Sequence, residues 1–265
     1  MSLIYDDLIS ISQPFPNPMA YEQALHLARM CALHQGTRLL DLACGRGEML
    51  NLWAREYNIQ GTGIDPDGRA IHHAMTRANE LEVWSQVQFA VDDALDYPQD
   101  YHQYNIVSYL SAGVASQIAD KLSTMRVALR DNEAGLLLFA DCFWRRTPTR
   151  AECDALGVQA SDFYDLADLV SALESYGTHL QDMLIITEAH WDAYYAREWR
   201  AVNAWLKDNP SHPDAPAVMA RARHTRTRYL KHERELVGWG VFVLEAQGTA
   251  RPAPTAYDDK PLWED

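Results

Sequence analysis

The sequence lacks the usual marks of a metalloprotein, a disulfide-bonded secreted protein and a membrane protein. Its 265 residues include four cysteines, and none forms a Cys-x-x-Cys pair or joins histidines at zinc-ligand spacing. It has no apolar run of about eighteen residues, and the N-terminal stretch MSLIYDDLIS has no basic start followed by an apolar segment. We therefore predict no bound metal, no membrane partner and a reduced, cytoplasmic location.

Positive charge is scarce. The chain has 23 lysines and arginines against 37 aspartates and glutamates, so its formal net charge is −14. Proteins that bind DNA or RNA along the phosphate backbone need an excess of positive charge on the binding surface. This balance argues against a nucleic-acid partner, although it leaves room for a local basic patch.

Predicted strands alternate with predicted helices over the first two thirds of the chain, which is typical of a parallel sheet with helices on both faces. The predicted strands are 37–44, 59–65, 87–93, 104–110, 134–141, 179–189 and 238–247. The predicted helices are 17–33, 47–57, 66–81, 115–130 and 161–177, and residues 143–157 are predicted to form a loop.

The predicted fold class is α/β, with a doubly wound, mostly parallel seven-stranded sheet in a single domain, 1–265. Residues 188–237, between the last two strands, are helical and aromatic-rich, and we interpret them as an insertion that forms a lid. The Pro-rich, acidic residues 248–265 are predicted to form an extended tail. Ligands of doubly wound sheets bind at the carboxyl ends of the strands.

The stretch RLLDLACGRGEML, residues 38–50, places Asp41 at the end of a strand and Gly45 and Gly47 in the following turn. Two glycines allow a ligand to approach bare backbone, beside the unpaired N–H groups of a helix start. A dinucleotide site prefers Gly-x-Gly-x-x-Gly, but Leu50 occupies the third position. The other interpretation is a site for S-adenosylmethionine (SAM), which carries an ammonium, a carboxylate, a ribose diol and an adenine.

The segment from Asp41 to Gly47 resembles the first motif of the class I SAM-dependent methyltransferases, an acid followed by spaced glycines. Ala43 stands where glycine is commoner in that family. The resemblance covers roughly residues 20–142 and the final strand pair, and it implies SAM as the cofactor. It implies that the carboxylate of Asp41 orients the methionine ammonium, while the backbone of Ala43, Gly45 and Gly47 lies against the cofactor.

The next strand ends carry further residues that fit this resemblance. Asp65 lies 24 residues after Asp41, at the end of the second strand, where the family has its ribose-binding acid. Asp93, followed by Ala94, falls at the position of the adenine-contacting acid, with Asp92 as the alternative. The end of the fourth strand, around Leu110, is expected to line the sulfonium.

In more detail, the chain resembles a group of bacterial methyltransferases without an assigned substrate, over about residues 15–245. The shared segments are GEMLNLWAREYNIQGTGID, FWRR, HWDAYYAREW and RELVGWGVFVL. This resemblance implies fold and cofactor but no acceptor.

The predicted function is a SAM-dependent methyltransferase acting on a small molecule. Alternatives are an RNA or protein methyltransferase of the same fold, a NAD-linked oxidoreductase and a SAM-binding protein without activity. The chain has no Asn-Pro-Pro-Tyr-like stretch of base-amino methylases and no Tyr-x-x-x-Lys pair.

The acceptor is predicted to bind between the end of the fifth strand and the insertion. Phe143, Trp144 and Arg145 follow the predicted end of that strand, and Trp191 and Tyr194 lie in the insertion. These five residues are the predicted walls of the acceptor pocket. The aromatic residues equally suit packing of the insertion onto the sheet.

Asp141 and His190 are the candidate general bases, needed only if the acceptor must lose a proton before attack. Residues 221–234 hold six basic side chains. We expect most of them to pair with acidic groups or to face solvent. An alternative is that Arg226 or Arg228 contacts an anionic acceptor.

Overall fold

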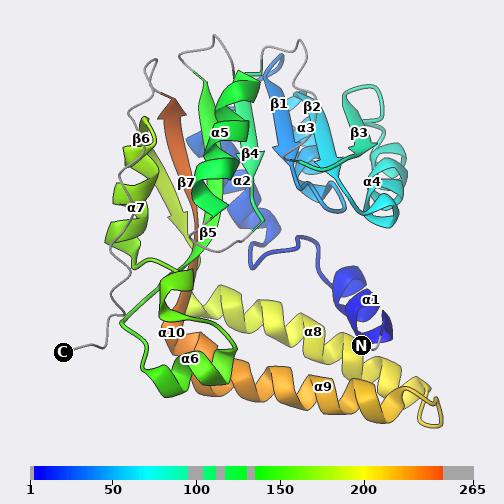
Figure 1. Cartoon of the computed structure of the whole chain (residues 1–265). Coiled ribbons are helices and arrows are strands. Elements are labelled where there is room, and N and C mark those ends of the chain that lie inside the picture. The colour runs from blue at the N-terminus through cyan, green and yellow to red at the C-terminus, as the bar shows by residue number, and fades with distance from the viewer. Residues whose placement is uncertain (1–2, 95–103, 112–116, 130–134, 247–265) are drawn as a thin grey trace.

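A seven-stranded sheet runs through the protein (Figure 1). The structure is a computed structural model that describes residues 3–94, 104–111, 117–129 and 135–246. The strand order is β3-β2-β1-β4-β5-β7-β6; β1 to β5 are parallel, and β7 is antiparallel to β5 and β6. The strands are β1 (Arg38–Leu42), β2 (Gln60–Asp65), β3 (Val87–Val91), β4 (Ile106–Tyr109), β5 (Leu136–Trp144), β6 (Thr178–Ile185) and β7 (Val237–Ala246).

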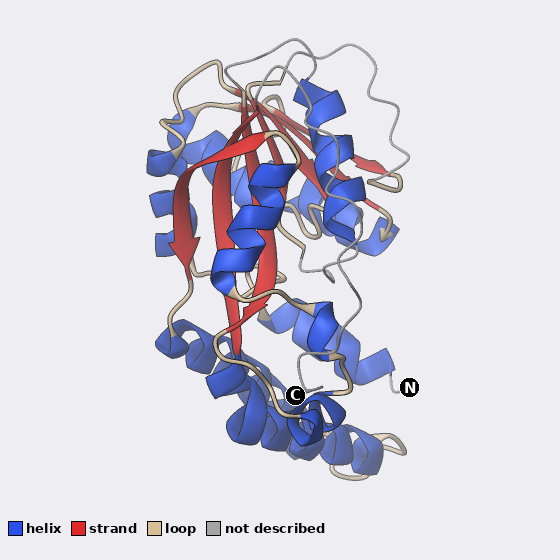
Figure 2. Cartoon of the chain, turned by 60° about the vertical axis from the view of Figure 1, so that its left-hand side comes forward, coloured by secondary structure: helices blue, strands red, loops and turns tan. Residues whose placement is uncertain are grey.

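Helices cover both faces of this sheet, which confirms the predicted fold class (Figure 2). Helices α2, α3 and α4 pack on one face, and α5 and α7 on the other. No helix in the described ranges is long and apolar enough to cross a membrane. The helices are α1 (Leu3–Ser12), α2 (Tyr21–Met30), α3 (Glu48–Tyr57), α4 (Gly68–Glu80), α5 (Ile118–Leu129), α6 (Arg150–Leu156), α7 (Leu166–Ser175), α8 (Glu188–Asp208), α9 (Ala215–Arg228) and α10 (Arg234–Leu236), with a short 3-10 helix at Ala160–Asp162.

Alternation along β5 shows how the core divides. Leu138 and Ala140 point into the cluster under α2 and α3, whereas Leu137 and Phe139 point into the cluster under α5 and α7. Successive side chains of a strand face opposite sides of a sheet, so a central strand covered on both faces is apolar throughout. The helices packed on the two faces of the sheet thus hold the strand ends in fixed positions.

The fifth strand is longer than the sequence predicts. We expected it to end at Asp141, but β5 continues to Trp144, because β7 pairs with it over its whole length from Leu136 to Trp144. The antiparallel partner supplies hydrogen bonds beyond the point where the parallel neighbour β4 ends. The predicted loop 143–157 is therefore wrong at both ends: β5 occupies its start, and α6 its end.

Two helix starts also differ from prediction. The helix expected from residue 17 begins at Tyr21, because the side chain of Asn17 accepts a hydrogen bond from Met19 N in the preceding turn (3.1 Å). The helix expected from residue 161 begins at Leu166, where the side chain of Asp165 caps Asp168 N at 2.9 Å. In both segments more than one residue has a side chain that can cap a helix, so the sequence alone does not determine where the helix begins.

Residues 188–237 form the predicted insertion between β6 and β7, and we call them the helical insertion. Its helices α8 and α9 lie beyond the carboxyl ends of β1 to β5, with α1 beside them (Figure 1). Tyr5 of α1 is buried there; its hydroxyl donates to Glu198 of α8 and lies 3.2 Å from Oγ1 of Thr225 in α9. The predicted tail 248–265 lies outside the described residues.

Candidate active site

The turn after β1 is held in an unusual backbone conformation. Ala43, Gly45 and Gly47 all have positive φ, of 58°, 56° and 67°. A Cβ on Gly47 would lie 2.5 Å from Cε1 of Phe89 and 2.7 Å from Cβ of Ala74, so only glycine fits. Ala43 adopts the same left-handed region at a cost of about 1–2 kcal/mol. The sequence thus forms a tight turn that brings the start of α3 close to the strand ends.

Asp65, at the end of β2, fixes this turn through backbone hydrogen bonds. Its Oδ2 accepts from Gly45 N at 2.8 Å, and its Oδ1 accepts from Asp67 N at 2.9 Å. An ionised carboxylate has about four lone-pair sites, so two remain for further donors. The carboxylate is half-buried and lies next to the glycine turn, as predicted from its position 24 residues after Asp41.

Asp41 is a buried carboxylate, 4% exposed, whose Oδ1 accepts from the hydroxyl of Ser108 at 2.7 Å. Burial raises the pKa of Asp41 to about 7, the Ser108 hydrogen bond opposes this, and the charge of Asp65 adds to it. Among the described residues no basic side chain contributes to the pKa shift of Asp41. An ammonium group beside Asp41 would therefore relieve an uncompensated buried charge.

The ends of β3 and β4 complete the same edge. The pairings Asp65↔Val91 and Leu42↔Tyr109 bring the strand ends level. Asp92 N donates to the carbonyl of Asp65 at 3.3 Å, and the exposed Asp93 donates its N–H to Asp92 Oδ1 at 2.9 Å.

Two buried apolar residues, Ala94 and Leu110, flank these polar groups. All eight predicted cofactor residues thus lie at or just after the carboxyl ends of four neighbouring strands of the sheet. We call the ends of β1 to β4 with these residues the cofactor edge.

Asp141 of β5 and Lys121 of α5 are buried charged residues. Asp141, 2% exposed, accepts from Cys142 N at 2.7 Å, and its charge favours protonated Lys121, whereas burial lowers the pKa of that lysine. Lys121 Nζ donates to the carbonyl of Ser111 at 3.1 Å and lies 4.8 Å from the centre of the Tyr109 ring. Sequence reasoning missed Lys121, because a lone lysine in an amphipathic helix is usually solvated.

Phe143 and Trp144 are packed into the fold. The ring of Phe143 lies flat on Gly238 of β7, where an added Cβ would come within 2.3 Å of it. Trp144 donates its indole N–H to the carbonyl of Ala160 at 2.8 Å and meets the Phe163 ring edge-on, 5.1 Å between centroids. Both side chains are buried because β5 continues through them.

Arg145 joins the two ends of the helical insertion. Its guanidinium lies 3.3 Å from the carbonyl of Val237, 3.4 Å from that of Ile186 and 3.7 Å from the carboxylate of Glu188. The side chain is thus engaged at the point where the chain leaves β6 and returns to β7.

His190, at the start of α8, connects the insertion to α2. Its Nε2 lies 2.6 Å from Gln23 Nε2, and its Nδ1 lies 2.8 Å from the Thr187 hydroxyl. Both ring nitrogens therefore have polar partners. Tyr194 is packed edge-on against Trp191, and its carbonyl accepts from Gln13 at 2.9 Å.

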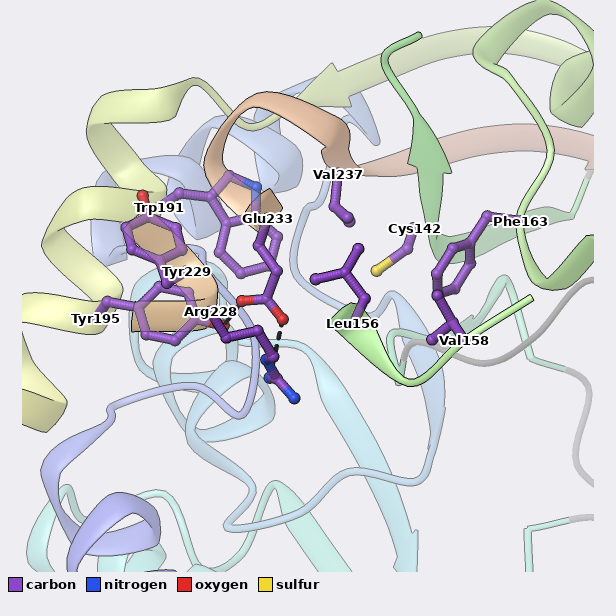
Figure 3. Close-up of a pocket in the computed structure, with 10 residues that line it drawn as sticks. All are labelled: Cys142, Leu156, Val158, Phe163, Trp191, Tyr195, Arg228, Tyr229, Glu233 and Val237. Atoms are coloured by element: carbon purple, nitrogen blue, oxygen red, sulfur yellow. Dashed lines mark hydrogen bonds and ion pairs between the residues drawn. The ribbon is translucent and has the colours of Figure 1, made fainter. Parts of the chain in front are cut away.

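A cavity of about 220 Å³ lies where the ends of β5 and β7 meet the helical insertion and residues 156–163 (Figure 3). Of the five predicted acceptor residues, only Trp191 lines it. Three of its rings form a stack, in which Tyr195 lies 6.0 Å from Trp191 and 4.0 Å from Tyr229. This aromatic cavity is lined by Cys142, Leu156, Val158, Phe163, Trp191, Tyr195, Arg228, Tyr229, Glu233 and Val237.

Glu233 supplies the carboxylate of the aromatic cavity. Its Oε2 accepts from the Tyr195 hydroxyl at 2.5 Å, and its Oε1 lies 2.8 Å from Nη2 of Arg228. Burial and the charge of Glu233 raise the pKa of Tyr195, so that hydroxyl keeps its proton and donates. In Figure 3 the Glu233 side chain extends between the aromatic rings on one side and Leu156 on the other.

Sequence reasoning missed Glu233 because of a local break in helical periodicity. Arg228 and Glu233 are five positions apart, a spacing that an α-helix does not bring to one face. Residues Tyr229–Glu233 form a π-helical turn, whose i to i+5 repeat brings the two charges together. Two other basic residues of 221–234 form ion pairs with acids on neighbouring helices: Arg221 binds Asp6 of α1, and Arg234 binds Asp192 of α8.

Comparison with known proteins gives consistent relatives. A family described as a methyltransferase domain matches residues 39–132. The uncharacterized protein YjhP of Escherichia coli (strain K12) is 35% identical over 234 residues, which are 87% of this chain and 93% of YjhP.

Two crystal structures with bound S-adenosyl-L-homocysteine (SAH) also resemble the chain. The SAM-dependent methyltransferase of Geobacter sulfurreducens has a TM-score of 0.83 and 31% identity, covering 92% of this chain and 98% of its own. That of Thiobacillus denitrificans has a TM-score of 0.83 and 32% identity, covering 93% and 99%.

Proposed function

This chain belongs to the SAM-dependent methyltransferases, and on that basis we propose that it methylates a small molecule bound in the aromatic cavity. The observation that carries the proposal is the cavity itself, about 220 Å³ in volume and lined on one side by aromatic residues of the helical insertion. Drug-sized ligands occupy pockets of about 300–1,000 Å³, so this volume suits a small metabolite better than a polymer.

SAM supplies a methyl group already activated by its sulfonium, so the protein has to position the acceptor and exclude water. We propose that Asp41 accepts from the methionine ammonium, because its carboxylate is buried and the Ser108 hydroxyl from which it accepts a hydrogen bond is neutral. Asp65 then accepts from the ribose hydroxyls with its two remaining lone-pair sites.

The other predicted cofactor residues form the walls of the same site. Gly45 and Gly47 expose backbone to the methionine end, and Ala43 shares their left-handed conformation. Asp93 accepts from the adenine amino group, with Ala94 and Leu110 as apolar contacts.

The helical insertion is proposed to close the acceptor site as a lid. His190 and Arg145 support this role: His190 contacts Gln23 of α2, and Arg145 contacts the carbonyls of Val237 and Ile186 and the carboxylate of Glu188. His190 is therefore proposed as an anchor of the insertion rather than as a base. Asp141 is proposed to hold Lys121 and the backbone of Cys142, and so to position the wall of the cavity.

Three residues predicted as walls of the acceptor pocket are proposed to have indirect roles instead. Trp144 supports Phe163, which lines the aromatic cavity, and Tyr194 supports Trp191. Phe143 holds β5 against β7. RNA and protein substrates remain the alternatives, disfavoured by the net charge of −14 and by the size of the cavity.

The proposal is tested with isotopically labelled SAM, purified protein and a bacterial cell extract separated into small molecules, RNA and protein. We expect the label in the small-molecule fraction, identified by mass spectrometry, and much less label with the Asp65→Ala variant at the same SAM concentration. Label that appears only in RNA or protein would refute a small-molecule acceptor while leaving the methyltransferase assignment intact.

A further inference from the structure

We propose that the acceptor is a phenol, a flat aromatic body carrying an acidic hydroxyl, and that Glu233 receives its proton during methyl transfer. The inference rests on the proposed function, because it names the substrate class of the same cavity. It is carried by the arrangement of two facing walls, one carboxylate and one guanidinium.

The walls of the aromatic cavity favour a flat apolar body. One side is the stack of Trp191, Tyr195 and Tyr229, and the other holds the aliphatic side chains of Leu156 and Val158 (Figure 3). Aromatic ligands gain from offset stacking on such rings in addition to the burial of their surface. A sugar or an amino acid would leave its polar groups against these walls without partners.

The charges of the cavity favour a neutral hydroxyl over a cationic amine. Arg228, at 2.8 Å from Glu233, already balances the carboxylate, so a second cation would meet its positive charge. A hydroxyl can donate to a free lone pair of Glu233, whose two oxygens each hold one protein donor. The guanidinium beside it then stabilises the negative charge that develops on the oxygen.

The basicity of a carboxylate selects the kind of hydroxyl. Carboxylates are weak bases, and a base is effective when its strength approaches that of the group it deprotonates. A phenol has a pKa of about 10, as tyrosine does, and is far more acidic than an aliphatic alcohol. Glu233 therefore suits a phenolic hydroxyl.

In the proposed methyl transfer, one bond forms and one breaks. The phenolic oxygen attacks the methyl carbon, the O–CH3 bond forms, and the C–S bond breaks with its electron pair moving to sulfur. The phenolic proton passes to Glu233 and then to solvent. The products are the methyl ether, SAH and one proton, and no oxidant or reductant is needed.

Binding is tested by calorimetry with SAH at saturation, using 2-naphthol and its matched ether 2-methoxynaphthalene, which lacks the O–H. We expect wild-type protein to bind 2-naphthol at least tenfold more tightly than the ether. Val158→Phe, which fills the cavity and leaves Glu233 in place, should abolish naphthol binding without changing SAH affinity. Equal binding of the two probes, or no binding of 2-naphthol, would overturn the inference.

Catalysis is tested with Glu233→Gln, and Glu235→Gln on the exposed side of α10 is the matched control. We expect conversion of 2-naphthol to its methyl ether by wild type and the control, and a loss of about a hundredfold or more in kcat for Glu233→Gln. SAH affinity and the thermal unfolding midpoint of each variant show whether the fold is intact. An unchanged kcat in a folded Glu233→Gln variant would overturn the assignment of Glu233.

The extract experiment separates this inference from the proposed function. If an amine, a carboxylate or an aliphatic alcohol is labelled and 2-naphthol does not bind, the phenol assignment is wrong and the proposed function stands. If no small molecule is labelled at all, both are wrong.

Discussion

The cofactor edge and the aromatic cavity are built in different ways. The cofactor edge depends on backbone conformation over a short stretch, with three positive φ values between residues 43 and 47 and one carboxylate at residue 65. The aromatic cavity depends on side chains from residues 142, 156–163, 191–195 and 228–237. A backbone site tolerates almost no change at a few positions, whereas a side-chain site can change its specificity by many small substitutions.

The largest effect is expected where the backbone site is tightest, at Gly47. Gly47→Ala adds a methyl group 2.5 Å from Phe89 in a left-handed conformation. The conformation costs about 1–2 kcal/mol, and the overlap adds about 1–3 kcal/mol. We expect SAH affinity to fall by more than about a hundredfold, measured by calorimetry, with a clear loss of stability in urea.

Gly157→Ala is the matched control, because Gly157 has a similar φ of 71° and no atom within 4 Å of an added Cβ. It should cost only about 1–2 kcal/mol of stability and leave SAH affinity unchanged. Similar SAH affinities for the two variants would mean that the turn does not depend on close packing at residue 47.

Asp65→Ala tests the side chain that ties this turn to β2. It removes a carboxylate that holds Gly45 N and Asp67 N, and the charge-assisted bonds proposed for the ribose, worth about 1.5–3 kcal/mol. SAH should bind about ten- to a hundredfold more weakly, and wild type should bind NAD much more weakly than SAH. Asp67→Ala, which removes a helix cap only, should lower stability by about 1 kcal/mol without weakening SAH.

The contrast between the cofactor edge and the aromatic cavity also explains which parts of the fold and of the site could be predicted from the sequence. The glycine turn, Asp41 and Asp65 lie within one stretch of the chain, and the roles proposed for them come from the resemblance of that stretch to the class I methyltransferases. The extension of β5 to Trp144 could not be foreseen, because β7, about a hundred residues later in the chain, provides its hydrogen bonds. Glu233 escaped notice because a π-helical turn changes which residues share a face.

Asp41 brings a pH dependence to the cofactor edge. Its folded pKa of about 7 lies above the ordinary value of 3.8, so between these values the folded state holds a proton that the unfolded state has lost. The free energy of unfolding should therefore fall as pH rises from about 4 to 7, by at most about 1.4 kcal/mol per pH unit, and level off above. Urea unfolding at pH 5 and pH 7.5 measures this.

Asp41→Asn separates this group from the others that titrate. Its stability should change less between the two pH values than that of wild type, since residue 41 no longer takes up a proton. Binding of SAH to the wild-type protein near pH 7 should also release protons, because the ammonium of SAH favours the charged form of the Asp41 carboxylate. Calorimetry in buffers of different ionisation enthalpy detects that release; equal pH slopes for both proteins would contradict the shifted pKa.

The smallest effect is expected at the adenine end, where the choice between Asp92 and Asp93 is open to a direct test. Asp93 is exposed, and its N–H is held by the carboxylate of Asp92, so Asp92 shapes the turn. One hydrogen bond to the adenine amino group contributes about 0.5–1.5 kcal/mol. Asp93→Ala should therefore weaken SAH by about two- to tenfold, with no change for S-ribosylhomocysteine, which lacks adenine. Asp92→Ala should lower stability and weaken both ligands alike through the turn. If Asp92→Ala shows the adenine-dependent loss and Asp93→Ala does not, then Asp92 is the residue that contacts the adenine amino group and Asp93 is not.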